Sequence, residues 1–221
     1  MLDLQYEQGP IRPPSEANSL LVRLTRNCPW NRCLFCPVYK GAQFSKRSPA
    51  EIKSDIDAMA AAASEIKELS FSAGCGGQVN RQVVALVQSG HPHLFPLAYW
   101  LYQGAERVFL QDADSLLLPV DQVEEVLLYL KEKFPTIKRV TTYARSRTLL
   151  RRSTEDLSRL KQAGLTRIHC GLESGSDRVL KYMEKGVSGE QHIEAGLKVK
   201  AANLSLSEYV MPGLGGETYW R

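Results

Sequence analysis

Apolar residues recur along this chain in two kinds of pattern, and the alternation of the two patterns predicts the secondary structure. Short apolar runs bounded by turn-forming residues occur at 20–24, 108–110, 140–143, 168–172 and 204–211. Runs of this length favour buried strands. The sequence therefore predicts five strands.

Between these runs, apolar residues recur at helical spacing. Helices are predicted over 119–134, 153–163 and 188–202, with a longer helix that begins at 48–51 and two short helical pieces between 83 and 102. Strands that alternate with helices of this length form right-handed βαβ units around a parallel sheet. The predicted fold class is α/β, with a partial parallel (β/α) barrel favoured over a Rossmann sheet, although periodicity alone does not separate the two.

The chain length favours one domain. A chain of 221 residues supports one good core and is too short for two comfortable domains. Residues 1–18 contain three prolines and are predicted to form an extended N-terminal arm, and residues 19–221 a single barrel domain. Residues 211–221 look like the loop after a strand and the first turn of an unfinished helix. We therefore expect the sequence to stop after the fifth strand of a longer protein.

Composition narrows the possible functions only a little. Hydrophobic residues make up 43% of the chain, charged residues 24%, and the net charge is +4, which by itself does not indicate a nucleic-acid partner. The N-terminus shows no secretory leader, and no run of about 18 apolar residues occurs. We expect a soluble, cytoplasmic protein without a membrane span.

Cysteine spacing is the first feature that indicates chemistry. The chain has five cysteines, and Cys28, Cys33 and Cys36 fall within nine residues directly after the first predicted strand. An odd number in an unsecreted chain argues against a disulfide framework. Loops at the carboxyl ends of parallel strands form the active sites of (β/α) barrels. Three thiolates on such a loop are suited to zinc or to an iron–sulfur cluster.

The number of thiolates leaves several interpretations open. A structural zinc site takes four protein ligands, and no second Cys-x-x-Cys pair occurs in the chain. A zinc-stabilised binding module would need a distant fourth ligand, as would an iron–sulfur electron carrier or sensor. An iron–sulfur cluster with three cysteine ligands leaves one iron open to a small molecule. The simplest alternative is that the cysteines are only small buried hydrophobic residues.

The cysteine loop resembles the cluster motif of the radical S-adenosylmethionine (radical SAM) superfamily, in which three cysteines follow the first barrel strand. An aromatic residue commonly precedes the last cysteine, and here it is Phe35. The resemblance implies that the three thiolates bind a [4Fe–4S] cluster whose fourth iron binds S-adenosylmethionine. This chain departs from the family pattern by having four residues, rather than three, between Cys28 and Cys33.

The resemblance extends along most of the chain, from about residue 20. The segment 171–177 is similar to the Gly-Leu-Glu-Ser-Gly segment of enzymes related to coproporphyrinogen oxidase, methylthiotransferases and Elongator-type proteins. The resemblance implies that these residues lie beside the cofactor: Phe35, Asp112, Asp114, Arg145, Glu173, Ser174 and Gly213. Asp112 and Asp114 would bind its ammonium group, whereas Arg145 would meet its carboxylate or an anionic substrate.

The activity implied by the resemblance is reductive cleavage of S-adenosylmethionine to a 5′-deoxyadenosyl radical. The substrate is not evident from the sequence and could be a small molecule or RNA. The reaction would also require an electron donor such as flavodoxin or ferredoxin. The oligomeric state is not indicated.

Overall fold

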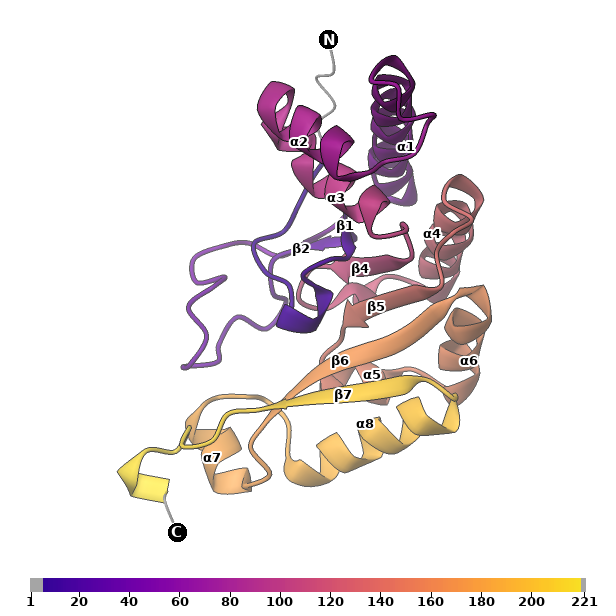
Figure 1. The fold of residues 1–221 in the computed structure, drawn as a ribbon. Coiled ribbons are helices and arrows are strands. Elements are labelled where there is room, and N and C mark those ends of the chain that lie inside the picture. The colour runs from indigo at the N-terminus through magenta and orange to yellow at the C-terminus, as the bar shows by residue number, and fades with distance from the viewer. Residues whose placement is uncertain (1–5, 220–221) are drawn as a thin grey trace.

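The computed structural model describes residues 6–219 and places a parallel sheet at the centre of the chain. Figure 1 shows its five strands side by side: β1 (Leu20–Arg23), β4 (Arg107–Gln111), β5 (Arg139–Tyr143), β6 (Leu165–Glu173) and β7 (Ser205–Val210), in the order β1-β4-β5-β6-β7. All four neighbouring pairs are parallel. The predicted partial barrel is therefore confirmed; within the described residues the sheet stays open, with β1 and β7 at its edges.

Eight helices follow the strands within the described residues, and those that pack against the strands cover one face of the sheet (Figure 1). The eight helices are α1 (Pro49–Ser72), α2 (Arg81–Gly90), α3 (Phe95–Tyr102), α4 (Val120–Lys133), α5 (Ser146–Arg151), α6 (Thr154–Ala163), α7 (Asp177–Tyr182) and α8 (Gly189–Ala201). Short 3-10 turns occur at Pro14–Glu16, Pro92–Leu94, Ser115–Leu117 and Glu217–Tyr219. A capping box begins α1, because the Ser48 side chain accepts from the Glu51 N–H while the Glu51 side chain accepts from the Ser48 N–H.

The differences from the sequence prediction have simple causes. Strand β6 begins at Leu165 rather than 168, because the polar residues Thr166 and Arg167 interrupt the apolar run, although Leu165 and Arg167 pair along the sheet. Helix α5 lies inside a basic stretch and is only six residues long, so it gives little periodicity. The two-residue strands β2 (Thr25–Arg26) and β3 (Ser45–Lys46) are likewise too short to predict.

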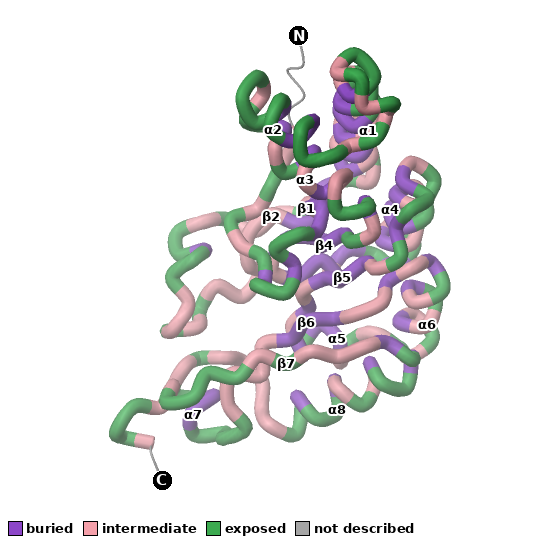
Figure 2. The backbone as a smooth tube through the Cα atoms, in the orientation of Figure 1, coloured by how far each residue is buried: buried purple, intermediate pink, exposed green. Residues whose placement is uncertain are grey.

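The hydrophobic core lies between the sheet and the helices (Figure 2). Alternate strand residues such as Val22, Leu110 and Ile168 face it and are fully buried. Helix residues such as Ile56 and Leu127 pack against them from the other layer. This two-layer core fixes where each strand ends and therefore where the loops that follow the strands meet.

The opposite face of the sheet is polar and aromatic, and the N-terminal arm lies against it. Gln111 in β4 accepts from the Gly9 N–H and donates to the Ile11 carbonyl, at 2.9 and 2.8 Å. Farther along the arm, the fully buried Glu16 bonds Arg139 of β5 and His169 of β6, at 2.5 and 3.1 Å. The described part of the predicted arm is therefore packed onto the sheet.

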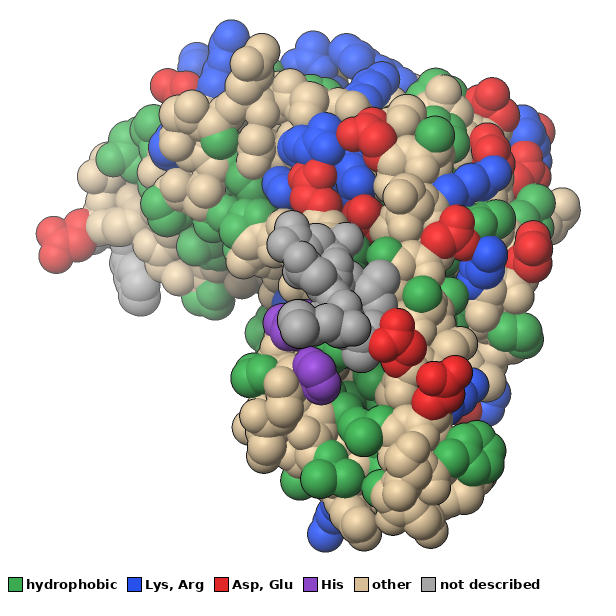
Figure 3. Space-filling model, turned by 90° about the horizontal axis from the view of Figure 1, so that it is seen from above, with side chains coloured by type: hydrophobic (Ala, Val, Ile, Leu, Met, Phe, Trp, Pro, Cys, Tyr) green, Lys and Arg blue, Asp and Glu red, His purple; other side chains and the backbone are tan. Residues whose placement is uncertain are grey.

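The surface carries both signs of charge. In the view from above, acidic and basic side chains are interspersed over much of the face (Figure 3). None of the described helices has the length and apolar character that crossing a membrane would require.

The position of the core predicts a large loss of stability for a buried isoleucine and a small loss for an exposed one. Ile56 of α1 is fully buried, whereas Ile193 of α8 is 67% exposed. Replacing Ile56 by alanine removes packed methyl groups and should lower the free energy of unfolding by about 2–5 kcal/mol. Ile193→Ala, the matched control, should change it by less than about 0.5 kcal/mol. Urea unfolding measures both, and similar losses in the two variants would contradict this placement of the core.

Candidate cofactor site

The cysteine loop begins where β1 ends and is closed at its base by a small antiparallel ladder. Strand β2 pairs with β3, so residues 27–44 form a loop whose two ends are held together. On its other side the loop is fastened to the turn after α7. The Leu34 N–H donates to the Met183 carbonyl at 3.1 Å, and the Trp30 indole N–H donates to the Glu184 carbonyl at 2.7 Å. The loop thus crosses from the first strand of the sheet to the segment after β6.

A cavity of about 240 Å³ lies beneath this loop, at the carboxyl ends of the strands. Six predicted site residues line it together: Cys28, Cys33, Phe35, Cys36, Arg145 and Glu173. The remaining walls include side chains of the strands and their following turns: Tyr143, His169, Lys185 and Tyr209. The structure therefore brings residues from widely separated parts of the chain to one cavity.

All three cysteines are free and partly buried. Burial raises the pKa of the Cys33 thiol, while the positive charges of Lys185 and Arg145 act in the opposite direction. Among residues 6–219 no three His, Cys, Asp or Glu side chains converge as ligands of a single metal ion would. In an iron–sulfur cluster each thiolate binds a different iron, so the sulfurs surround the cluster instead of meeting at one point. Three soft donors that face one cavity fit such a group.

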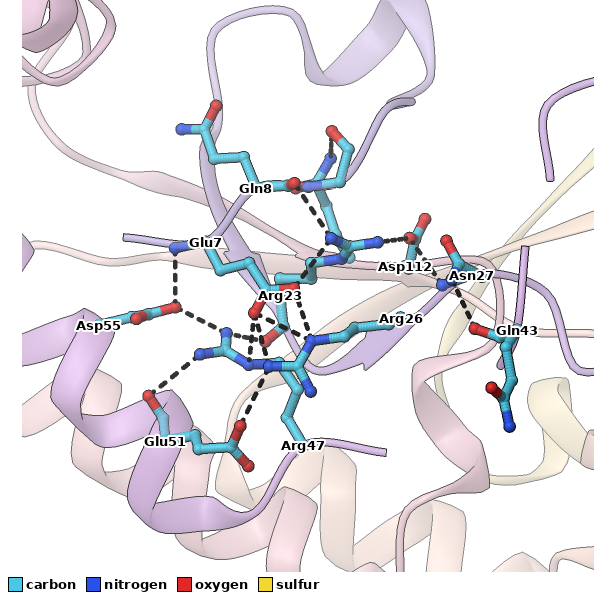
Figure 4. Close-up of polar contacts among 12 residues, drawn as sticks. Glu7, Gln8, Arg23, Arg26, Asn27, Gln43, Arg47, Glu51, Asp55 and Asp112 are labelled. Carbon is cyan, nitrogen blue, oxygen red and sulfur yellow. Dashed lines mark hydrogen bonds and ion pairs between the residues drawn. The ribbon is translucent and has the colours of Figure 1, made fainter. Parts of the chain in front are cut away.

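Asp112 lies at the end of β4 and holds the base of the cysteine loop (Figure 4). Its buried carboxylate accepts from the Arg23 guanidinium at 2.8 Å and from the Asn27 N–H at 3.2 Å. The Tyr39 hydroxyl donates to its other oxygen. Because Asn27 precedes the first cysteine and Tyr39 follows the last, one carboxylate fixes both ends of the cysteine segment.

The network around Asp112 continues into the arm and α1 (Figure 4). Glu7 forms ion pairs with Arg23, Arg26 and Arg47, at 2.9, 2.7 and 3.4 Å. Arg47 also pairs with Asp55 of α1 at 2.6 Å. The arm, the end of β1 and the first helix are therefore joined beneath the loop.

Asp114 is also engaged with protein groups. Its fully buried carboxylate accepts from the Thr148 hydroxyl at 2.5 Å and from the Arg145 N–H at 3.3 Å. Burial raises the pKa of Asp114 to about 6, and these hydrogen bonds oppose the rise. Neither Asp112 nor Asp114 lines the cavity. Their predicted contact with the cofactor's ammonium group stays a prediction that this arrangement does not favour.

The residues after β6 and β7 are only partly brought together. Glu173, with a positive φ of 65°, turns its carboxylate to the Lys185 ammonium at 2.9 Å. The Ser174 hydroxyl accepts from the Ser176 N–H at 3.1 Å, which closes a local turn. Gly213 is exposed in the loop after β7. Neither Ser174 nor Gly213 lines the cavity, so their cofactor roles also stay predictions.

Lys185 is the main cavity residue that the sequence did not reveal. Its ammonium pairs with Glu173 and lies 5.5 Å from the centre of the Phe35 ring. Its carbonyl accepts from Arg145 at 3.2 Å. Lys185 belongs to the turn after α7, and only the fold shows that this turn reaches the cysteine loop. Its place ten residues after the Gly-Leu-Glu-Ser-Gly segment is only a weak signal in the sequence.

Asp112→Asn tests whether this carboxylate anchors the loop or contacts the cofactor. The change leaves the Arg23 guanidinium without its buried anion and should lower the free energy of unfolding by about 1–3 kcal/mol. A loop anchor also predicts less iron per chain after reconstitution, with normal S-adenosylmethionine affinity in the loaded fraction. Tyr39→Phe removes one of the same hydrogen bonds. It should lower both the free energy of unfolding and the iron content by less than Asp112→Asn does. Full iron loading with weakened S-adenosylmethionine binding would instead support direct contact.

Asp114 predicts a pH dependence of stability. Its folded pKa of about 6 lies above the ordinary value of 3.8, so between these pH values the folded chain holds a proton that the unfolded chain has lost. Stability from this group is present below pH 3.8 and is lost as pH rises through about 6. Asp114→Asn keeps the shape and removes the titration. Urea unfolding should show the wild type losing on the order of 2–3 kcal/mol relative to this variant across the window; a constant difference would contradict it.

Comparisons with known proteins agree with this geometry. The family model described as the Radical SAM superfamily matches residues 22–221. OxsB, a cobalamin-dependent S-adenosylmethionine radical enzyme, superposes with a TM-score of 0.57 and 20% identity. The match covers 86% of this chain and 23% of the OxsB chain. TsrM from Kitasatospora setae is a radical S-adenosylmethionine methyltransferase solved with cobalamin and a [4Fe–4S] cluster. It superposes with a TM-score of 0.52 and 14% identity, and the match covers 93% of this chain and 34% of TsrM. No curated protein sequence matches significantly.

At these identities the two structures support the fold alone, and this chain spans only about a quarter to a third of their length. The family match is independent of them and covers nearly the whole chain. The chain belongs to the radical SAM superfamily of enzymes, and its cofactors are a [4Fe–4S] cluster and S-adenosylmethionine.

Proposed function

We propose that Cys28, Cys33 and Cys36 bind three irons of the [4Fe–4S] cluster, and that S-adenosylmethionine takes the fourth in the cavity beneath the loop. The observation that supports this most directly is that the three thiols line one cavity with Arg145, Glu173 and other polar side chains. Reductive cleavage of S-adenosylmethionine at such a cluster supplies a 5′-deoxyadenosyl radical, which abstracts hydrogen from a substrate.

The cavity walls suggest how the protein binds the nucleoside. Arg145 and Lys185 carry positive charge at the same wall and suit the carboxylate of the methionine part. Glu173 is the acidic group that lines the cavity and suits the ammonium group, once it exchanges its bond to Lys185. Phe35 and Tyr143 give apolar surface that excludes water from the reacting bond.

The cavity also favours this function over the alternatives. A zinc module or an electron carrier needs a fourth protein ligand at the cysteines. The lining includes one histidine, His169, whose nitrogens bond Glu16 and the Tyr209 hydroxyl, at 3.1 and 3.4 Å. The carboxylate in the lining, Glu173, pairs with the Lys185 ammonium at 2.9 Å. Because protein groups engage both side chains, the lining supports a fourth position that is open to a bound molecule.

Substrate and reductant come from outside the described site. We propose a substrate, either a small molecule or RNA, that enters beside the aromatic wall formed by Tyr143 and Tyr209. A low-potential carrier such as flavodoxin or ferredoxin would supply the electron. We place the protein in the cytoplasm, where thiols stay reduced.

Cys33→Ala tests the cluster assignment, with Cys75→Ala as its matched control. Cys75 is another free, partly buried cysteine, and it does not line the cavity. After anaerobic reconstitution, Cys33→Ala should lose the cluster absorption and release no 5′-deoxyadenosine from S-adenosylmethionine above the background without protein. Cys75→Ala should keep the wild-type iron content and electron paramagnetic signal. A fully loaded, S-adenosylmethionine-responsive cluster in Cys33→Ala would overturn the proposal.

A further inference from the structure

The outer surface of the cysteine loop combines exposed apolar side chains with cations. Leu34 and Val38 on the loop are 58% and 40% exposed, and Tyr182 at the end of α7 is 48% exposed. Exposed basic residues accompany them on both segments. We call this surface the loop face and define it by these residues: Arg32, Leu34, Val38, Lys40, Lys181 and Tyr182.

The two segments of the loop face are held together by specific contacts. The hydrogen bond from Leu34 to Met183 joins the loop directly to the residue after Tyr182. The Arg32 guanidinium lies 5.0 Å from the centre of the Trp30 ring, and Trp30, Arg32 and Lys181 line one shallow surface hollow. These contacts bring Arg32 and Leu34 of the loop next to Lys181 and Tyr182. Lys40 is held to the same loop, because its ammonium donates to the Asn31 carbonyl at 3.1 Å.

Its charge is unbalanced. The segment 27–47 contains four basic residues and no acidic residue. Within residues 6–219, Arg32, Lys40 and Lys181 form no ion pair, although Asp177 and Glu184 are nearby.

Two further guanidiniums strengthen the positive field. Arg145 and Arg147 lie 5.0 and 5.9 Å from the centre of the same Trp30 ring. One nearby acid is engaged within the chain, because the Asp177 carboxylate accepts from the Gly189 N–H at 2.6 Å. A partner that fits must carry acidic side chains around a small apolar centre.

We propose that the loop face docks the electron donor, an acidic low-potential protein carrier. The inference rests on the proposed function and adds the surface that serves it. Leu34 lies between Cys33 and Cys36 in the sequence, so a carrier seated on it comes close to two cluster ligands. One electron leaves the reduced carrier and one enters the cluster. The loop face serves reduction, and the cavity beneath serves the nucleoside.

Charge reversal on the loop face tests this surface. The full-length protein is reconstituted anaerobically, and flavodoxin hydroquinone reduces its cluster in a stopped-flow spectrometer. Arg32→Glu/Lys181→Glu should slow the second-order reduction at low salt by at least about tenfold, because it removes electrostatic steering. Added salt should slow the wild type and affect the variant little. The control, Lys67→Glu/Lys200→Glu, makes the same charge change at exposed positions of α1 and α8 and should stay near the wild-type rate.

A small reductant separates this proposal from the proposed function. Reduced methyl viologen, a cation, should reduce the cluster of Arg32→Glu/Lys181→Glu at least as fast as that of the wild type. If the reconstituted wild type shows no iron–sulfur absorption for either reductant to bleach, the cluster assignment fails. If methyl viologen succeeds and flavodoxin reduces all three proteins equally, the loop face is not the docking surface.

Binding gives a second readout that does not depend on turnover. Labelled flavodoxin titrated with each protein should show weaker affinity for Arg32→Glu/Lys181→Glu by at least about tenfold, measured as fluorescence anisotropy. Lys40→Glu/Lys181→Glu, which leaves the Arg32–Trp30 contact intact, should show a similar loss. Unchanged affinity in both variants would overturn the proposal, even if Arg32→Glu disturbed the loop.

Discussion

The site depends on a buried carboxylate at the end of β4. Asp112 binds Arg23 from β1, the backbone of Asn27 and the hydroxyl of Tyr39, so the cysteine segment is fastened at both ends to the sheet. A charge removed from water is stable only with such partners, and the partners are held in place in return. The cavity beneath the loop is therefore a consequence of how Asp112 is satisfied.

The sequence predicted the parts of the site that depend on strand ends. Cys28 and Arg145 follow strands and Glu173 ends another, and a parallel sheet places such residues at one edge. The sequence could not show which protein groups a buried carboxylate bonds. Asp112 and Asp114 were expected beside the cofactor, but the structure engages both with protein groups, because their partners lie far away along the chain.

The N-terminal arm was predicted only as an extended segment. Its three prolines indicate extension but not where it packs. The structure joins Glu16 to Arg139 and His169 on the polar face of the sheet. Burial would raise the pKa of Glu16, but its hydrogen bonds to His169 and Ser19 and the charge of Arg139 lower it. A buried carboxylate that bonds side chains from two strands therefore fixes the arm on the inner face of the sheet.

The central claim is that three thiolates leave one iron available to S-adenosylmethionine. Mössbauer spectroscopy of protein reconstituted with isotopically enriched iron tests it most directly. On addition of S-adenosylmethionine, the account predicts that a single iron of the [4Fe–4S] cluster changes its isomer shift as it gains nitrogen and oxygen ligands, while the others keep theirs. A spectrum in which every iron stays unchanged would contradict it.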